Sequence, residues 1–291
     1  MIITVASGKG GTGKTTVAVN LAQAVEAMHP LTFMDCDVEE PNAHFFIKPK
    51  ITKKTIVSLP VPEVDEKKCT YCGECAKICV FNALAVLEDS VLVFPELCHG
   101  CGGCHLLCPE NAIKEIDRRI GILEEGNSRQ IRFFHGKLDI GQALSPPLIR
   151  AVKKHIPDAG PVIIDAPPGT SCPAIESMKD SDVICLVTEP TPFGLHDLIL
   201  AVKSAQKMGI PAGVVINKAG FGDEEVRSFC QAEGIPVLLE IPLDRRIAEL
   251  CSKGLTLIDS FPDLKKKFLA LYKDLKGLAN RPRSPEEEAA K

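Results

Sequence analysis

Short, uninterrupted runs of apolar residues recur along most of the chain, and they predict strands buried in a parallel sheet. The first run spans residues 2–6, and a Gly-rich turn and a helical pattern over residues 14–27 follow it. The later runs are short and bounded by Pro, Gly and Asp, which favours strands over the alternative of buried helices. Uninterrupted rather than alternating runs are typical of strands that are covered on both faces. The later runs lie at residues 31–34, 162–164, 183–187, 213–216 and 237–241.

Helical patterns separate most of these runs, for example at residues 195–208 and 224–233. Alternation of strand and helix is the pattern of a doubly wound fold, in which helices cover both faces of a mostly parallel sheet. We therefore expect a doubly wound, mostly parallel α/β sheet for the greater part of the chain.

The alternation breaks at about Pro60 and Pro62, and it resumes after about residue 118. Eight of the 13 cysteines of the chain fall within the interrupted segment. The segment consists of two similar halves, each followed by an Asn-Ala pair, and such an internal repeat indicates a compact unit.

These boundaries predict the domain organisation. We expect a small α+β, ferredoxin-like domain at residues 61–118, inserted into an α/β domain that comprises residues 1–60 and 119–280. A strand pair over residues 120–140 would return the chain to the larger domain. The charged and Pro-rich residues 281–291 are expected to form a disordered tail.

The composition narrows the classes of protein that fit. Hydrophobic residues make up 45% and charged residues 25% of the chain, as in an ordinary globular protein. The formal net charge of −4 argues against nucleic acid as the main partner. No stretch approaches the roughly 20 apolar residues of a membrane span, and the N-terminus lacks a signal-peptide pattern, so we expect a cytoplasmic protein. Clustered cysteines in such a protein indicate metal or redox chemistry rather than disulfides.

A glycine-rich loop follows the first predicted strand. Residues 8–15 match the phosphate-binding pattern G-x-x-x-x-G-K-[ST] and lie between a strand and a helix. The alternative is an ordinary Gly-rich turn. In a phosphate-binding loop, backbone N–H groups surround the phosphates of ATP or ADP, Lys14 reaches the β- and γ-phosphates, and the Thr15 hydroxyl binds Mg²⁺. The predicted nucleotide contacts here are Gly8, Lys9, Gly10, Gly11, Thr12, Gly13, Lys14, Thr15 and Thr16.

The loop contains Lys9 in addition to Lys14, and this extra lysine gives it a deviant Walker A pattern. At this point the sequence resembles the superfamily of MinD, ParA, Mrp and the nitrogenase iron protein. The resemblance implies an ATPase, stimulated by a partner, that forms a homodimer around its nucleotides. It also implies that Lys9 reaches the phosphates bound by the other subunit, so that both Lys9 and Lys14 are catalytic.

Three further segments fit this resemblance. Asp35-Cys36-Asp37 is similar to switch I, in which Asp37 would position or activate the attacking water. Asp165 opens an Asp-Ala-Pro-Pro-Gly segment that is similar to Walker B running into switch II, where Asp165 would support Mg²⁺. Asn217 is similar to the residue that recognises the purine. The alternative is that these strand-end residues are helix caps or turn formers.

The clustered cysteines form two runs with the spacing C-x₂-C-x₂-C-x₃-C. Pro109 follows the last cysteine of the second run, whereas Val80 takes the corresponding place after the first run. This is the run of bacterial ferredoxins, in which the fourth Cys of each run ligates the other cluster. Zinc is the alternative, but structural zinc prefers two separated pairs of ligands. We therefore expect two [4Fe–4S] clusters, one held by Cys69, Cys72, Cys75 and Cys108, and the other by Cys98, Cys101, Cys104 and Cys79.

Two features outside these motifs leave alternatives open. Cys172 lies beside switch II, near the place where the nitrogenase iron protein carries a cluster ligand, but a packing residue or free thiol is the favoured interpretation. The last predicted helix carries an apolar stripe opposite a set of lysines. MinD docks on membranes with such a helix, but we favour packing on the sheet. The stripe consists of Leu264, Phe268, Leu271, Tyr272, Leu275 and Leu278.

These motifs lead to three functional hypotheses. The first is an ATPase that couples its nucleotide state to electron transfer or partner docking through its clusters, with a redox partner that the sequence does not identify. The cysteine unit lies between switch I and switch II, which rearrange when the γ-phosphate is lost. The second is an iron–sulfur cluster carrier, by resemblance to Mrp, although the C-x-x-C of such carriers has no counterpart at Cys230 and Cys251. The third is a regulatory or positioning ATPase whose clusters sense redox state.

Overall fold

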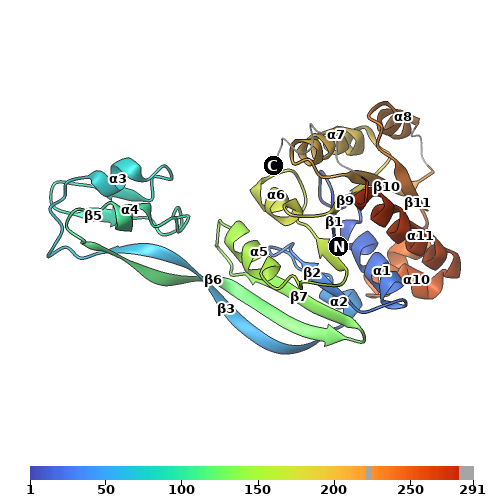
Figure 1. Cartoon of the computed structure of the whole chain (residues 1–291), viewed down its shortest axis with the longest axis horizontal. Coiled ribbons are helices and arrows are strands. Elements are labelled where there is room, and N and C mark those ends of the chain that lie inside the picture. Colours follow the sequence, from blue (N-terminus) through green and yellow to red (C-terminus); the bar gives the residue numbers. More distant parts are fainter. Residues whose placement is uncertain (221–223, 282–291) are drawn as a thin grey trace.

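The chain folds into a layered α/β domain and a small cysteine-rich unit, which stands at the end of a two-stranded ribbon (Figure 1). The computed structural model describes residues 1–220 and 224–281. Within them, the domain is built on one nine-stranded sheet. In spatial order its strands are β11 (Val237–Pro242), β10 (Ala212–Ala219), β9 (Val183–Thr188), β1 (Ile2–Ala6), β8 (Val162–Asp165), β2 (Leu31–Asp35), β7 (Ile131–Leu138), β6 (Ile113–Ser128) and β3 (Lys50–Val64).

The strands from β11 to β7 are parallel to one another, whereas β6 is antiparallel to both β7 and β3. The helices of this domain are α1 (Lys14–Glu26), α2 (His44–Ile47), α5 (Pro146–Lys153), α6 (Cys172–Met178), α7 (Pro192–Lys207), α8 (Glu224–Ala232), α9 (Arg245–Ser252), α10 (Leu257–Ser260) and α11 (Pro262–Ala279). The expected fold class, a doubly wound and mostly parallel α/β sheet, is confirmed.

Helices cover both faces of the sheet, and the central strands are apolar on both sides for that reason. In β9, Val183 and Cys185 pack into the layer that contains α1, α10 and α11. The alternating residues Ile184 and Leu186 pack into the opposite layer, with α6, α7 and α8. Both sets of positions must therefore be apolar, which produces the uninterrupted runs from which the strands were predicted.

The apolar stripe of α11 belongs to the protein core. All six of its residues, from Leu264 to Leu278, are buried against the sheet and α1, while the lysines of the helix are exposed. The expected packing on the sheet is therefore confirmed, and the apolar face of α11 is not free to dock on a membrane. None of the described helices is both long and apolar enough to cross a membrane.

The ribbon of β3 and β6 belongs to the sheet over only half of its length. Because β7 pairs with β6 only over residues 121–128, residues 113–120 of β6 extend beyond the sheet with their partners in β3. At about 3.3 Å per residue, this length places the tip of the ribbon roughly 25 Å from the end of β7. Pro60 and Pro62 lie inside β3 rather than in a linker. An edge strand tolerates proline because only one of its sides forms ladder hydrogen bonds.

The cysteine-rich unit at the tip contains two short helices and a small sheet. They are α3 (Glu74–Ile78), α4 (Gly103–Leu106) and the antiparallel pair β4 (Leu84–Val86) and β5 (Val91–Val93). The expected strand pair over residues 120–140 is present as β6 and β7, but β6 begins earlier and also pairs with β3. Since β3 and β6 cross the expected boundaries without a break, a separate domain at residues 61–118 stays a prediction. Residues 282–291 of the predicted tail lie outside the described residues.

Candidate functional site

Polar side chains from distant parts of the chain meet at the carboxyl ends of the parallel strands, where open α/β sheets bind their ligands. The loop of residues 8–13 joins β1 to α1 at this edge. Asp35 ends β2, Asp165 ends β8, and Asn217 lies near the end of β10. The strand order places β1 between β8 and β9, so the loop after β1 lies between the residues that end β8 and those that follow β9.

Lys14 is the charged centre of this edge. Its Nζ lies 3.6 Å from Asp165 Oδ1 and 3.8 Å from Asp37 Oδ2, and its side chain is 8% exposed. The Thr15 side chain also faces the carboxylate of Asp165. A buried ammonium group is tolerated only with such partners. The predicted residues Lys14, Thr15, Asp37 and Asp165 thus lie together.

Asn217 shapes the phosphate-binding loop. Its Nδ2 donates a hydrogen bond of 2.7 Å to the carbonyl oxygen of Thr12. Gly13, the next residue, has a φ of 88°, and a Cβ there would lie 2.2 Å from Asn217 Nδ2. Only glycine fits both the left-handed backbone and this close approach. Asn217 therefore holds the loop in this structure, and its role in purine recognition stays a prediction.

The remaining predicted loop contacts lie around these residues. Gly8 is packed so closely that a Cβ would lie 2.1 Å from the carbonyl oxygen of Asp197. Gly10 and Gly11 are exposed at the tip of the loop. The hydroxyl of Thr16 lies 3.8 Å from Cys251 Sγ. The nucleotide contacts assigned to these residues stay predictions.

Asp35 has a structural role that sequence reasoning missed. Its buried carboxylate accepts backbone hydrogen bonds from Asp37 at 3.1 Å, Asn42 at 3.1 Å and Ala43 at 3.0 Å. These bonds hold the segment after β2, similar in sequence to switch I, against the end of its own strand. The Asp-x-Asp spacing was the only signal in the sequence, and it does not distinguish a ligand-binding carboxylate from one that orders a loop.

The carboxylates at this edge carry more negative charge than Lys14 balances. Burial raises the pKa of Asp37 to about 6, although Lys14 lowers it. Burial and the neighbouring Asp165 hold the pKa of Asp35 well above its usual value. Burial also raises the pKa of Asp165 against the effect of Lys14, and neither carboxylate oxygen of Asp165 receives a hydrogen bond of normal geometry. A divalent cation would balance this charge, so the residues present fit Mg²⁺ held by Thr15 and Asp165.

Glu189, at the end of β9, is a second residue that the sequence reasoning missed. Its Oε2 lies 3.4 Å from Lys9 Nζ, and its other oxygen pairs with Lys218. Lys218 Nζ also donates to the carbonyl oxygen of Gly11, at 3.4 Å. Lys9 is therefore paired within its own chain in this structure. The position of Glu189 just after a buried strand, at the same edge as the loop, was the signal that could have identified it.

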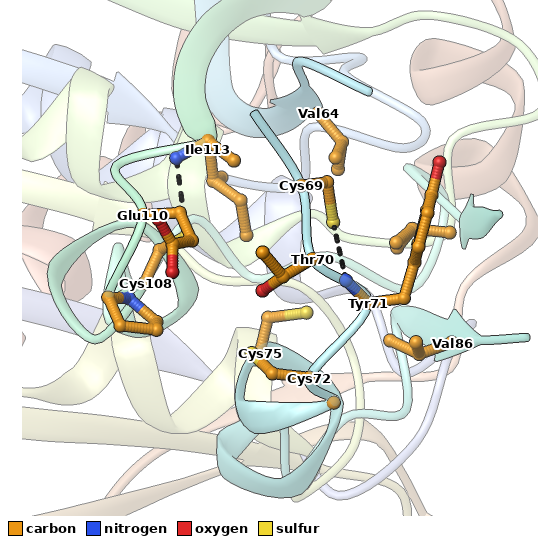
Figure 2. A pocket seen from close by; sticks show the side chains of 14 residues that line it. Val64, Cys69, Thr70, Tyr71, Cys72, Cys75, Val86, Cys108, Glu110 and Ile113 are labelled. Carbon is orange, nitrogen blue, oxygen red and sulfur yellow. Dashed lines mark hydrogen bonds between the residues drawn. The ribbon is translucent and has the colours of Figure 1, made fainter. Parts of the chain in front are cut away.

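A cavity in the cysteine-rich unit, open to solvent, is shown in Figure 2. Cys69 and Cys72 approach it from the loop before α3, Cys75 from α3 itself, and Cys108 from the segment before β6. Three of these cysteines belong to the first sequence run and the fourth belongs to the second.

A second cavity is lined by the other four cysteines. Here Cys98, Cys101 and Cys104 come from the second run, and Cys79 comes from the first. Each cavity is therefore lined by three consecutive cysteines of one run and the last cysteine of the other. This division matches the crossed ligand sets that the ferredoxin spacing predicts.

The repeat in the sequence has a physical counterpart around the cysteine sulfurs. Asn82 and Asn111 follow the last cysteine of each run by three residues, and both adopt the left-handed conformation, with φ of 52° and 48°. Asn is among the few residues that tolerate this conformation. The turn lets the next residue donate its N–H to the cysteine sulfur, at 3.3 Å in each half. Cys69 Sγ and Cys98 Sγ each accept an N–H bond at 3.4 Å as well.

These surroundings fit a four-thiolate cluster in each cavity. N–H donors to the sulfurs and a partly apolar lining are the features by which proteins hold iron–sulfur clusters and tune their potentials. In the part of the chain that the structure describes, no three His, Cys, Asp or Glu side chains converge on a single metal ion. A [4Fe–4S] cluster does not require such convergence, because each of its four thiolates binds a different iron.

Cys172 lies at the first position of α6 and is exposed as a free thiol. Of the two interpretations that the sequence favoured, the structure supports the free thiol rather than the packing residue. By contrast, Cys36, Cys185 and Cys230 are buried, and burial raises the pKa of the Cys185 thiol to about 12. These three are packing residues of the core.

Comparisons with known proteins agree with this geometry. The model of the CobQ/CobB/MinD/ParA nucleotide binding domain matches residues 3–258. An uncharacterized protein of Methanocaldococcus jannaschii is 31% identical over 279 residues, which cover 95% of this chain and 96% of that protein. An iron–sulfur cluster carrier protein of Pyrococcus horikoshii is 25% identical over 305 residues, covering 94% and 88%. The septum site-determining protein MinD of Pyrococcus horikoshii, solved with Mg-ADP, shares the fold with a TM-score of 0.59 at 20% identity, covering 96% and 97%.

The raised pKa of Asp37 leads to a prediction about stability. With a pKa of about 6 in the folded state against about 3.9 for a free aspartate, ionised Asp37 destabilises the nucleotide-free protein above pH 6. This cost is lost gradually as the pH falls from about 6 to about 4. We expect Asp37→Asn to raise the denaturation midpoint most at about pH 7.5 and by only about half as much at about pH 5. Urea titrations of variant and wild type at both pH values measure this. Glu225→Gln, at an exposed position of α8 whose charge does not act on Asp37, is the control. A gain from Asp37→Asn that does not depend on pH would contradict the assignment.

Proposed function

Because the chain belongs to the CobQ/CobB/MinD/ParA family of nucleotide-binding domains, we propose that it is an ATPase which couples ATP binding and hydrolysis to two [4Fe–4S] clusters. The clusters would serve electron transfer to a partner protein, or would dock that partner. The observation that carries the proposal is the division of the eight cysteines between two cavities, each lined by one complete crossed ligand set.

The nucleotide half of the proposal follows from the edge around Lys14. ATP would bind with its phosphates against the backbone N–H groups of residues 8–13, and Lys14 would turn from its carboxylate partners to the β- and γ-phosphates. Asp165 and the Thr15 hydroxyl would hold Mg²⁺, whose charge would balance the Asp165 carboxylate. Asp37, whose pKa is raised toward 6 by burial, would then orient the attacking water as a general base.

The role proposed for Lys9 requires a second subunit. In this structure Lys9 pairs with Glu189 of its own chain. To stabilise the phosphates in a neighbouring subunit, it must leave that ion pair. The Lys9 side chain is 32% exposed and Glu189 has Lys218 as a second partner, so phosphate charge can replace Glu189 as the partner of Lys9. We therefore propose a homodimer that forms around bound ATP.

The cluster half of the proposal follows from the cysteine-rich unit. Cys69, Cys72, Cys75 and Cys108 would hold one cluster, and Cys79, Cys98, Cys101 and Cys104 the other. When bound, such clusters each accept and donate single electrons. The chain supplies four thiolates and backbone N–H donors to each, and the open position of the unit at the tip of the ribbon (Figure 1) leaves it accessible to another protein.

The connection between the two halves is the reason to propose coupling. The ribbon strand β3 follows the segment Asp35–Ala43 after one short helix, and the return strands β6 and β7 lead through α5 to β8 and Asp165. Both connections of the cysteine-rich unit therefore lead to the segments that are similar to nucleotide switches.

An iron–sulfur cluster carrier is a second candidate function, favoured by the relatives that bear this name and align over most of the chain. It differs from the first in the fate of the clusters. A carrier releases its cluster to an apo-acceptor, whereas a cluster held by four thiolates in a lined cavity should be retained. Mixing the holo-protein with an apo-ferredoxin and following iron transfer distinguishes the two.

The crossed ligand sets predict the iron content of paired cysteine variants. Wild-type protein should bind about eight iron atoms per chain. Cys75 and Cys108 line the same cavity, so the variant Cys75→Ala/Cys108→Ala is expected to lose one cluster and keep about four iron atoms. Iron and acid-labile sulfide analysis after anaerobic purification measures this.

The matched control removes two cysteines of the same sequence run. Cys75 and Cys79 line different cavities, so Cys75→Ala/Cys79→Ala should lose both clusters. If this control kept four iron atoms while Cys75→Ala/Cys108→Ala lost all of them, each run would hold its own cluster, and the assignment would be wrong.

The proposed role of Lys9 leads to a further prediction. Lys9→Ala should still bind Mg·ATP, because Lys14 and the loop remain, but it should fail to dimerise and should hydrolyse ATP roughly a hundredfold more slowly or worse. Calorimetry, light scattering and phosphate release measure the three properties. Lys203→Ala, an exposed lysine on α7, is the control. A Lys9→Ala protein that dimerises normally with ATP would show that this lysine does not act across subunits.

A further inference from the structure

The ribbon strand β3 presents one apolar face that continues from the core of the α/β domain into the cysteine-rich unit. Val57 and Leu59 pack into the buried cluster that contains Phe134 and Leu148. Val61, the next residue on the same face, packs with Ala83 and Cys98 of the cysteine-rich unit. The two hydrophobic clusters are thus adjacent along a single strand face.

The loop that carries Cys98 folds back onto this face. A Cβ on Gly100 would lie 2.7 Å from Leu59 Cδ1 and 3.2 Å from the carbonyl oxygen of Pro60, so the loop backbone rests directly on Leu59. Arg118 of β6 holds the start of the loop, donating to the carbonyl oxygen of Pro95 at 2.7 Å and pairing with Glu96 at 3.2 Å.

The two cysteine-lined cavities differ in where they contact the ribbon. The cavity of Cys79, Cys98, Cys101 and Cys104 is lined by Pro60 and Pro62 from the middle of the ribbon. The other cavity meets the ribbon only at Val64 and Ile113, the last residue pair of β3 and β6. Val64 is five residues beyond Leu59, or about 16 Å along an extended strand. We call the cavity of Cys79, Cys98, Cys101 and Cys104 the proximal site and the other cavity the distal site.

The segment after β2 reaches the same core from the nucleotide side. Val38, the residue after Asp37, accepts a hydrogen bond of 2.9 Å from Leu138 N at the end of β7. Its Cγ1 lies 2.6 Å from the place where a Cβ on Gly136 would be. Val38 also belongs to the buried cluster that contains Leu59 and Ile120. A displacement of Asp37 therefore acts on the packing under Leu59.

Ile120 lies where the ribbon leaves the sheet. In the pairing of β3 with β6, Ser58 faces Arg119 and Val57 faces Gly121, so Ile120 is the extra residue of a β-bulge. Its carbonyl oxygen accepts a hydrogen bond of 2.9 Å from Asp139 N, and its side chain is 2% exposed. A bulge anchored in the core gives the ribbon a fixed pivot at the end of β7.

From these contacts we propose that the proximal site is the one that responds to nucleotide, with Leu59 as the positioning residue that transmits the change from Asp37 and Val38 to the loop of residues 98–104. The distal site touches the ribbon at Val64 and Ile113, beyond Leu59. This inference rests on the proposed function, since it requires that the protein bind both nucleotide and clusters.

Hydrogen–deuterium exchange of the holo-protein, with and without Mg·ADP, tests the proposal. In the wild type, amides of residues 98–104 should change their exchange rate by about threefold or more, while those of residues 69–75 change less. Protection of residues 8–15 in the same experiment reports nucleotide binding. In Leu59→Ala the response at 98–104 should disappear while protection of 8–15 remains.

Three further variants complete the test. Ile56 precedes Val57, lies on the opposite face of β3 and is 61% exposed. The variant Ile56→Ala should therefore keep the wild-type response. Leu59→Met, which keeps the volume, should restore it, and the milder Leu59→Val should reduce it if Leu59→Ala does not fold. Equal responses at both loops in the wild type, or a full response in folded Leu59→Ala, would overturn the inference. Absence of iron, or of protection at residues 8–15, would instead refute the proposed function and the inference with it.

Discussion

The burial of the Lys14 ammonium group between two carboxylates is the interaction on which the rest of the structure depends. Asp165 and Asp37 lie within 4 Å of Lys14 Nζ, and each comes from the end of a different parallel strand or from the segment that follows it. Removing Lys14 would leave the buried carboxylate of Asp165 without its counter-charge, and breaking a buried ion pair in this way typically costs about 3–5 kcal/mol. The need to compensate these charges therefore fixes how the ends of β1, β2 and β8 are placed relative to one another.

The same constraint extends to the cysteine-rich unit. Asp35 orders the segment that carries Asp37 through three backbone hydrogen bonds, and Val38 attaches that segment to β7. β7 pairs with β6, and β6 pairs with β3 out to the tip of the ribbon. A change in the charge around Lys14, such as the arrival of phosphates and Mg²⁺, thus acts on a continuous set of packed and hydrogen-bonded elements that leads to the cysteines.

Much of this arrangement was predictable from local patterns. The strands β1, β8 and β9 are apolar on both faces because helices cover both, so their runs are visible in the sequence. The division of the cysteines between two cavities was predictable, because the ferredoxin run has a fixed cysteine spacing. The ribbon was not, since β3 contains Pro60 and Pro62 and alternates irregularly, and its pairing with β6 joins residues far apart in the chain. Glu189 and the hydrogen bonds of Asp35 were missed for the same reason: a single carboxylate acquires its role only when the fold supplies its partners.

The central claim is that the nucleotide state of the α/β domain reaches the clusters of the cysteine-rich unit. The most direct test is an anaerobic potentiometric titration of the wild-type holo-protein, followed by electron paramagnetic resonance, with Mg·ATP, with Mg·ADP and without nucleotide. We expect the midpoint potential or the spectrum of a cluster to differ between these states. Identical potentials and identical spectra in all three, in a protein that binds both nucleotides, would contradict the claim.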